Sequence, residues 1–228
     1  CDNPTSIQYD AVRLFDAKTS ANLGQPCCEL GPGNPINVGT GNKYVGQNDF
    51  AGPGHLSLDR HYNSYAQAAV VSLGPGWRLG IDRRIEFAVG STSSLTIERE
   101  DGQRLRYQKV GNVWSTSTDI SDRLVEELDG AGAIAGFKFT SSQGGWDEYF
   151  DVAGVLRKIE YRDGEAVVYR YSDASTPASV APAPGYLIEV TNRSGRGLAL
   201  SYGADKRLAQ VRLPDGTAVA YTYDAAGR

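Results

Sequence analysis

The chain has 228 residues, and 23 Lys and Arg against 27 Asp and Glu give it a formal net charge of −4. This balance gives no reason to expect nucleic acid or an anionic membrane surface as a partner. No run of 18 apolar residues occurs, so no membrane-spanning helix is expected. Glycine (27 residues) and tyrosine (13 residues) are abundant, which is typical of many short strands joined by tight turns.

Residues 1–33 show weak periodicity and are predicted to form an N-terminal arm. They hold all three cysteines, Cys1, Cys27 and Cys28. An odd count with two adjacent thiols fits no zinc pattern, since structural zinc requires four ligands. Two interpretations remain open: a disulfide from Cys1 to Cys27 or Cys28 in an oxidising compartment, or a lipid-bearing mature N-terminus at Cys1. The first residue is not Met, so we expect the chain to begin after processing or as a fragment.

Residues 34–145 are predicted to form a β-rich domain. Apolar and polar residues alternate in short stretches, as at Leu56 and Leu58. Ile120–Leu128 is the one stretch that we consider a candidate for a short helix. Asp101-Gly102 precedes Leu105 and Tyr107 with a spacing that recurs further along the chain. We therefore expect a degraded form of the downstream repeat in this domain.

Residues 146–228 repeat with a period of 21: Phe150 to Tyr171 is one period and Tyr202 to Tyr223 is another. An insertion of about ten residues within 173–185 lengthens the middle copy and is expected to form a loop outside the sheet. Such short-period self-similarity is typical of stacked units that cannot bury an apolar face alone. The aligned positions are Tyr169, Leu200 and Tyr221, then Tyr171, Tyr202 and Tyr223, and the turn residues Gly164, Gly195 and Gly216.

Each repeat is predicted to be a β-hairpin. Val167 and Tyr169 in the first copy, like Val219 and Tyr221 in the third, alternate with smaller or polar residues, so they should face one apolar side. Asp-Gly pairs between the strands are strong hairpin signals, because glycine adopts positive φ without strain. The fold class is therefore all-β, with antiparallel hairpin repeats and less than about a tenth helix. We expect Tyr221–Arg228 to form the last strand and half a turn, leaving an unpaired edge.

Several motifs of this chain resemble those of Rhs, or YD-repeat, proteins. The segment Tyr221–Arg228 resembles the tyrosine-aspartate motif of their repeat. The upstream part is similar to the domain of unknown function that precedes those repeats, and the resemblance spans about Gly33 to Arg228. The upstream residues that carry it are Gly33–Val38, Thr40-Gly41-Asn42, Arg60–Ser64 and Gly74–Trp77.

The resemblance implies a large secreted or cell-surface bacterial protein. Members of this family include polymorphic toxins and the shell-forming components of insecticidal toxin complexes, in which the repeats coil into a hollow β shell around a C-terminal toxin. This chain would then be the start of a spiralling β-sheet shell, preceded by a β-rich N-terminal domain. Its partners would be the rest of the parent shell and the toxin cargo, and the toxin activity would belong to that longer parent.

No residue is predicted to have a catalytic, cofactor-binding or metal-binding role. The loop at Gly39–Lys43 lacks the Gly-Lys-Ser/Thr of a phosphate loop. His61 is expected to be a packed strand residue, and Trp77 a turn anchor rather than a sugar platform. The acidic pairs are expected to be solvated surface rather than the carboxylates of a glycosidase; they are Glu98/Glu100, Glu126/Glu127 and Asp147/Glu148.

Three other functions remain open beside the structural module. One is a cell-surface adhesion or carbohydrate-binding module. Another is an extracellular filament subunit, a homo-oligomer that assembles by strand addition at open strand edges. The third and weakest is a hydrolase.

Overall fold

The computed structural model describes residues 24, 36–37, 41–66 and 72–228. Within these residues the chain forms sixteen strands and no helix, which confirms the all-β prediction. Cys1, Cys27 and Cys28, the loop segment 38–40 and all but one residue of the predicted arm lie outside the described residues.

The strands form three antiparallel sheets. The first sheet has the order β1 (Tyr44–Ala51), β2 (Ser57–Asn63), β3 (Trp77–Leu79). The second has the order β4 (Arg84–Phe87), β5 (Ser94–Glu98), β6 (Arg104–Val110), β7 (Val113–Ser115). We call these two the upstream sheets.

The third sheet has nine strands, each paired with its neighbours in the chain, and we call it the repeat sheet. Its strands are β8 (Arg123–Leu128), β9 (Ile134–Thr140), β10 (Trp146–Asp151), β11 (Leu156–Tyr161), β12 (Ala166–Tyr171), β13 (Leu187–Asn192), β14 (Gly197–Tyr202), β15 (Leu208–Arg212) and β16 (Ala218–Ala220). The sheet therefore runs without a break across residues 145 and 146 and begins upstream of the three recognised repeats.

The prediction of a short helix at Ile120–Leu128 is wrong, because most of this stretch is strand β8. Leu124 is buried and Val125 is exposed, which is the two-residue alternation of a strand. Leu124 also pairs with Phe139 of β9, so the cross-strand contact with an aromatic residue decides the local structure.

The predicted hairpins are present with the predicted phase. The strand-start leucines Leu156, Leu187 and Leu208 are all buried, with exposed fractions of 0%, 7% and 0%. The turn residues Gly164, Gly195 and Gly216 have φ of 84°, 79° and 87°, a region that non-glycine side chains rarely adopt. Residues 173–185 lie outside the strands as predicted. This loop still contacts the sheet: Ala181 is 3% exposed, and the Val180 carbonyl accepts a hydrogen bond from the Tyr202 amide at 2.9 Å.

An aspartate holds the turns at one end of the repeat hairpins. The Asp224 carboxylate accepts backbone hydrogen bonds from Ala226 and Arg228, two and four residues on, at 2.9 and 2.8 Å. Asp151 and Asp129 make the same pair of contacts with the amides two and four residues on. The aspartate of the motif is thus explained by local turn geometry. Its presence at Asp129 extends the repeat to the β8–β9 hairpin.

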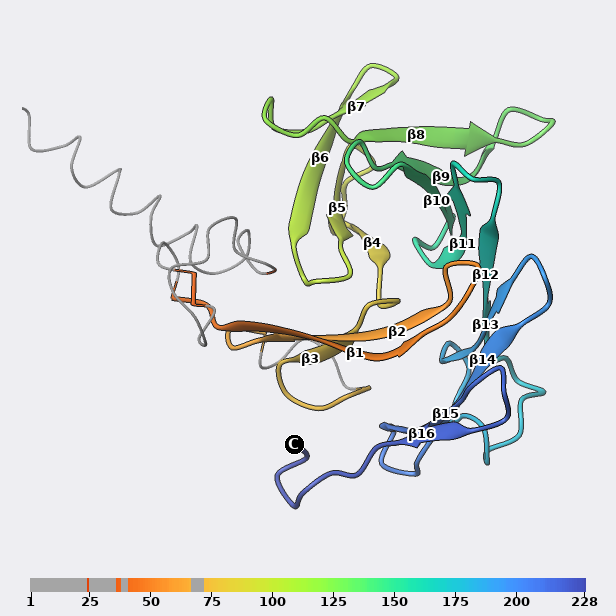
Figure 1. The fold of residues 1–228 in the computed structure, drawn as a ribbon. Coiled ribbons are helices and arrows are strands. Elements are labelled where there is room, and N and C mark those ends of the chain that lie inside the picture. Colours follow the sequence, from red (N-terminus) through yellow and green to blue (C-terminus); the bar gives the residue numbers. More distant parts are fainter. Residues whose placement is uncertain (1–23, 25–35, 38–40, 67–71) are drawn as a thin grey trace, which may run out of the picture.

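The repeat sheet curves around the upstream sheets (Figure 1). In that view it passes from β8 at the top, down the right-hand side, to β16 at the bottom, and β1–β3 lie across its concave side. One cluster of buried apolar residues joins all three sheets, from Leu56 on the upstream side to Val211 of β15. The upstream strands therefore share a core with the repeats, and they are not a separate appendage.

Candidate functional site

The residues that join the upstream sheets to the repeat sheet form the most distinctive polar site of the molecule. At its centre the Glu148 side chain of β10 is 0% exposed. Arg99, which follows β5, binds both Glu148 oxygens, with N–O distances of 2.7 and 2.9 Å. Arg83, between β3 and β4, pairs with the same carboxylate. The Trp146 indole N–H also donates to Glu148 Oε1 at 2.8 Å.

Two opposing effects set the protonation of Glu148. Burial by itself would raise the pKa of this carboxyl, but the positive charges of Arg83 and Arg99 outweigh it, and the pKa lies below its usual value. Glu148 is therefore ionised at neutral pH, and one carboxylate of the repeat sheet compensates two buried arginines of the upstream sheets. Glu100 adds further negative charge, at 3.2 Å from Arg83 Nε.

A second buried carboxylate, Glu98, joins the two upstream sheets to each other. It is 2% exposed and lies 3.2 Å from Arg78 Nη1 of β3 and 2.8 Å from Arg84 Nε of β4. The expectation that the acidic pairs are solvated surface is therefore wrong for Glu98 and Glu148. Neighbouring residues could not reveal this, because the arginines that allow burial come from other parts of the chain. The remaining members of the pairs, Glu100, Glu126, Glu127 and Asp147, are half-buried.

The tip of the β1–β2 hairpin contacts the turns of the repeat sheet. The His55 ring stacks on Tyr161 with 3.7 Å between ring centroids. Its Nε2 lies 2.7 Å from Asp163 Oδ2, in the β11–β12 turn. Asn192, at the next turn on that side, donates to the Pro53 carbonyl at 3.2 Å. These contacts fix the hairpin tip to two successive repeat turns.

A second contact of the same hairpin, at the β1 bulge near Asp49, reaches the segment after β16. The Tyr221 hydroxyl donates to Asp49 at 2.7 Å, and Asp49 accepts a hydrogen bond from Arg60 Nη2, also at 2.7 Å. The Tyr223 hydroxyl donates to the Leu208 carbonyl at 2.8 Å. The β1–β2 hairpin thus spans the concave side from the β11–β12 turn to the segment after β16.

These contacts correct the prediction for the last repeat. Strand β16 ends at Ala220, so Tyr221–Arg228 is not a strand. The Tyr221 amide still donates to the Ala209 carbonyl at 2.9 Å, after which the chain reaches the Asp224 turn. Tyr221 and Tyr223 are only half-buried, whereas Tyr169 and Tyr202 are buried; the first two lie after β16, at the edge of the sheet. We predicted that Tyr169 and Tyr221 face one apolar side, and at the edge of the sheet Tyr221 is less buried than this prediction requires.

The other singled-out residues lie within the framework. Leu200 is 2% exposed and Tyr171 is half-buried. His61 of β2 lies with Nδ1 2.7 Å from the Tyr44 hydroxyl, and burial lowers its pKa, so it is neutral. In the described part of the chain, no group of three or more His, Cys, Asp or Glu side chains could hold a metal ion. In the same part, no helix is long and apolar enough to cross a membrane.

The two edges of the repeat sheet differ. Trp114 and Lys109 of the second upstream sheet cover β8 in part, because both bind Glu126, at 3.0 and 2.7 Å. Strand β16 pairs with β15, and no second neighbour occurs among the described residues. Its side chains at Ala218 and Ala220 are exposed. The sheet thus has one partly covered edge and one accessible edge.

Comparison with known families matches two parts of the chain. Residues 33–107 match the family described as "Domain of unknown function (DUF6531)", which covers the upstream sheets from β1 into β6. Residues 204–228 match the family described as "RHS Repeat", which covers β15, β16 and the Asp224 turn. No curated protein matches the chain. With this domain upstream and the repeat downstream on one continuous core, the two matches support the N-terminal region of an Rhs/YD-repeat protein.

Proposed function

We propose that the chain is a non-catalytic structural module, the N-terminal wall and closure of an Rhs-type β shell. In a longer parent protein this shell would encapsulate or deliver a C-terminal toxin. The two family matches support this proposal. Rhs-repeat proteins are typically extracellular or on the cell surface, which supports a secreted or cell-surface location here as well.

The observation that carries the proposal is the way the upstream sheets occupy the concave side of the repeat sheet. The Glu148 cluster fixes them at β10, and the β1–β2 hairpin fixes them at both the β11–β12 turn and the segment after β16. A domain so placed closes the space inside the first turn of a curving sheet and sets its curvature. This is the function expected of an end cap, since terminal units of repeat arrays differ from the internal ones.

The accessible edge at β16 supports continuation of the wall. An unpaired strand offers backbone N–H and C=O groups to another strand. In the parent protein the next repeat would pair there and extend the sheet.

The test is to append one further Rhs repeat, beginning with Leu, after Arg228. The added hairpin should raise the melting temperature and suppress concentration-dependent association, because it covers β16. The matched control is a Gly/Ser extension of the same length. If the original chain is a stable monomer at high concentration and gains nothing from the repeat, the open-wall proposal is wrong and a self-contained binding module becomes the better account.

The same edge favours a second candidate, a filament subunit that assembles by strand addition. Ala218→Lys with Ala220→Lys places two charges on the exposed side of β16, which disfavours pairing with another chain. If light scattering shows large assemblies that disappear in this variant while folding is kept, the filament is supported. An array of neutral glycans separates both structural roles from the adhesion alternative.

A further inference from the structure

The structure contains a cavity of about 410 Å³ between the β3–β4 connection and the ends of β12, β13 and β14. It lies apart from the β16 edge. Its size falls within the range of small-molecule sites, roughly 300–1,000 Å³. The residues whose chemistry matters here are Arg78, Asp82, Tyr171, Tyr186, Tyr202 and Lys206, all of which line it.

Arg83 and Arg84 also line the cavity, but they pair with Glu148 and Glu98. The Arg78 side chain is 4% exposed, and its two terminal nitrogens bind Glu98 and the Asp82 carbonyl. Its Nε is buried and has no hydrogen-bond partner among the described residues. Arg78 therefore contributes positive potential to the cavity wall, while its donors are bonded or buried beneath the surface of the cavity.

Lys206 supplies a second positive charge. It lies in the β14–β15 turn with φ of 69°, a conformation that a non-glycine residue adopts at some cost. Its ammonium group forms no ion pair with any residue that the structure describes. The turn holds it there through a hydrogen bond from the Lys206 amide to the Gly203 carbonyl at 2.9 Å.

Three tyrosines also line the cavity. The Tyr186 and Tyr202 rings meet edge to face with 4.8 Å between centroids. The Tyr202 hydroxyl donates to the Leu187 carbonyl at 2.8 Å, but the hydroxyls of Tyr171 and Tyr186 have no hydrogen-bond partner in the described part of the chain. Burial and the nearby Asp82 charge raise the pKa of Tyr171, so this phenol stays protonated and can donate.

Asp82 completes the polar lining. Its carboxylate accepts a hydrogen bond from the Leu79 amide at 2.8 Å, and burial raises its pKa. A carboxyl group in this position can accept hydrogen bonds from ligand hydroxyls. The cavity therefore combines cationic groups, free phenol hydroxyls, one carboxyl group and aromatic ring surface.

We propose that this cavity binds a small sugar acid, a uronic acid monosaccharide or the uronic acid unit of a longer glycan. The ligand carboxylate fits the Lys206 ammonium group, because a cation paired with a carboxylate forms the stronger kind of hydrogen bond. The ring hydroxyls fit Tyr171, Tyr186 and Asp82, and the apolar face of the sugar ring packs on the tyrosine rings. This role goes beyond the structural one and does not depend on the β16 edge.

The test uses the full chain and isothermal titration with sodium glucuronate. Glucose is the neutral control ligand, and inorganic phosphate and acetate are the anion controls. Glucuronate should bind, and glucose should bind about tenfold more weakly, the size expected from losing one charge-assisted contact. Lys206→Asn removes the charge with a residue that tolerates positive φ, and Tyr186→Phe removes one free hydroxyl. Each variant should weaken glucuronate binding several-fold with little change in melting temperature.

Two control variants isolate the cavity. Arg212→Gln removes an exposed arginine of β15, and Tyr65→Phe removes the hydroxyl of an exposed tyrosine; neither residue lines the cavity. Both should bind glucuronate as the unchanged chain does. The proposal is overturned if glucuronate does not bind, if phosphate or acetate binds equally well, or if Lys206→Asn and Tyr186→Phe leave the affinity unchanged.

Discussion

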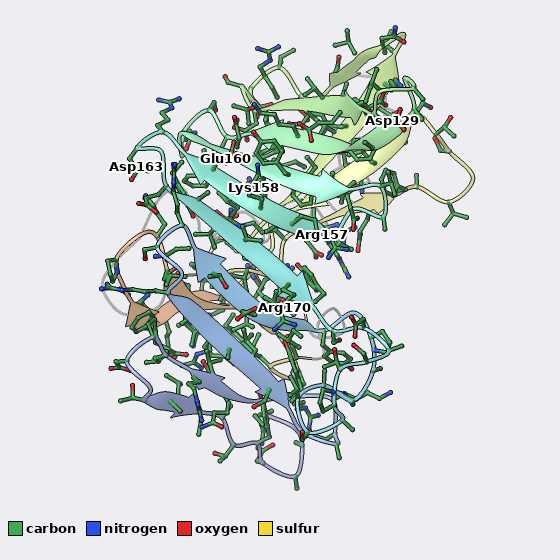
Figure 2. The ribbon with its side chains drawn as sticks, turned by 90° about the vertical axis from the view of Figure 1, so that its right-hand side faces the viewer. Asp129, Arg157, Lys158, Glu160, Asp163 and Arg170 are labelled. Carbon is green, nitrogen blue, oxygen red and sulfur yellow. The ribbon has the colours of Figure 1, made fainter. Side chains whose placement is uncertain are left out.

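The two faces of the repeat sheet use charge in opposite ways. On the concave face, Glu148 is fully buried between Arg83 and Arg99. On the outer face, Figure 2 shows Arg157, Lys158, Glu160 and Arg170 along β11 and β12.

The ion-pair distances of the two faces are nearly equal. Arg170 and Glu189 are 2.7 Å apart, with 62% and 41% of their side chains exposed. Arg99 and Glu148 are also 2.7 Å apart, with 7% and 0% exposed. Water screens the exposed pair, while removal of one partner from the buried group leaves uncompensated charge in a poorly solvated site. The ion pairs that hold the sheets together therefore differ from the surface pairs in burial and not in distance.

The largest expected effect is at the buried cluster. Glu148→Ala should lower the free energy of unfolding by about 3–5 kcal/mol, because two arginines lose their shared carboxylate. Urea denaturation followed by tryptophan fluorescence measures this change. Glu189→Ala on the outer face is the matched control and should cost less than about 1 kcal/mol. Equal costs for the two variants would contradict the distinction between the faces.

Removal of a buried ring of the concave face should have a similar but slightly smaller effect. Tyr169 is 6% exposed, and Tyr169→Ala should cost about 3–4 kcal/mol through lost burial and the resulting cavity. Tyr149 lies on β10, is half-buried and stacks with Lys138 and Lys158 instead. Tyr149→Ala, measured by the same denaturation, should cost clearly less. A larger loss at Tyr149 would show that the outer face contributes more to stability than its exposure indicates.

Acid should weaken the concave face selectively. The pKa of Glu148 lies below its usual value in the folded chain, so the folded state binds fewer protons than the unfolded state as pH falls. The stabilisation from Glu148 is present above the unfolded pKa of glutamate, about 4.3, and is lost as pH falls through the lower folded pKa. Thermal melts between neutral and strongly acidic pH should show this loss. In Glu148→Gln the acid-dependent part of the decrease should become smaller, and an unchanged pH profile would exclude Glu148 as its source.

The contact between Tyr221 and Asp49 should have a moderate effect. Tyr221→Phe removes the 2.7 Å hydrogen bond to Asp49 while keeping the ring. The expected cost is about 1–2 kcal/mol, since one hydrogen bond to a charged acceptor is lost at a half-buried site. Relative to the unchanged chain, hydrogen exchange of this variant should become faster in β15 and β16 and should change less in β10. Tyr65→Phe, at an exposed position, serves as the control, and an equal effect there would contradict a specific role for the Asp49 contact.

The smallest expected effect is on the outer face itself. Arg170→Ala should change the free energy of unfolding by about 0.5 kcal/mol or less at physiological salt, because its partner Glu189 remains solvated. Denaturation at low and high salt checks this expectation. A cost near that of Glu148→Ala would show that the outer pairs form a coupled network.

Much of the repeat sheet could be predicted from the 21-residue period. The period gives the buried positions of β11, β13 and β15, the turn glycines and the loop at 173–185, since these depend on residues close in sequence. The period did not reveal that the sheet begins at β8, because the β8–β9 hairpin keeps the Asp129 turn but lacks the tyrosines. It also placed Tyr221 in a strand, whereas β16 ends at Ala220 and the Tyr221 hydroxyl binds Asp49.

The sequence by itself therefore determined the fold class and the hairpin unit and indicated the resemblance to Rhs proteins, because alternation, turn chemistry and spacing are local properties. The tertiary structure alone decided which charged residues are buried between the sheets and stabilise the fold. Glu148 and Glu160 both lie among polar and aromatic residues on adjacent strands, and nothing near them in the sequence separates the two roles. Only the approach of Arg83 and Arg99 from the upstream sheets, 65 and 49 residues away along the chain, makes Glu148 a buried ionised group. The same approach of distant segments forms the cavity that Arg78, Lys206 and the tyrosines line, since a cavity exists only where packed elements meet.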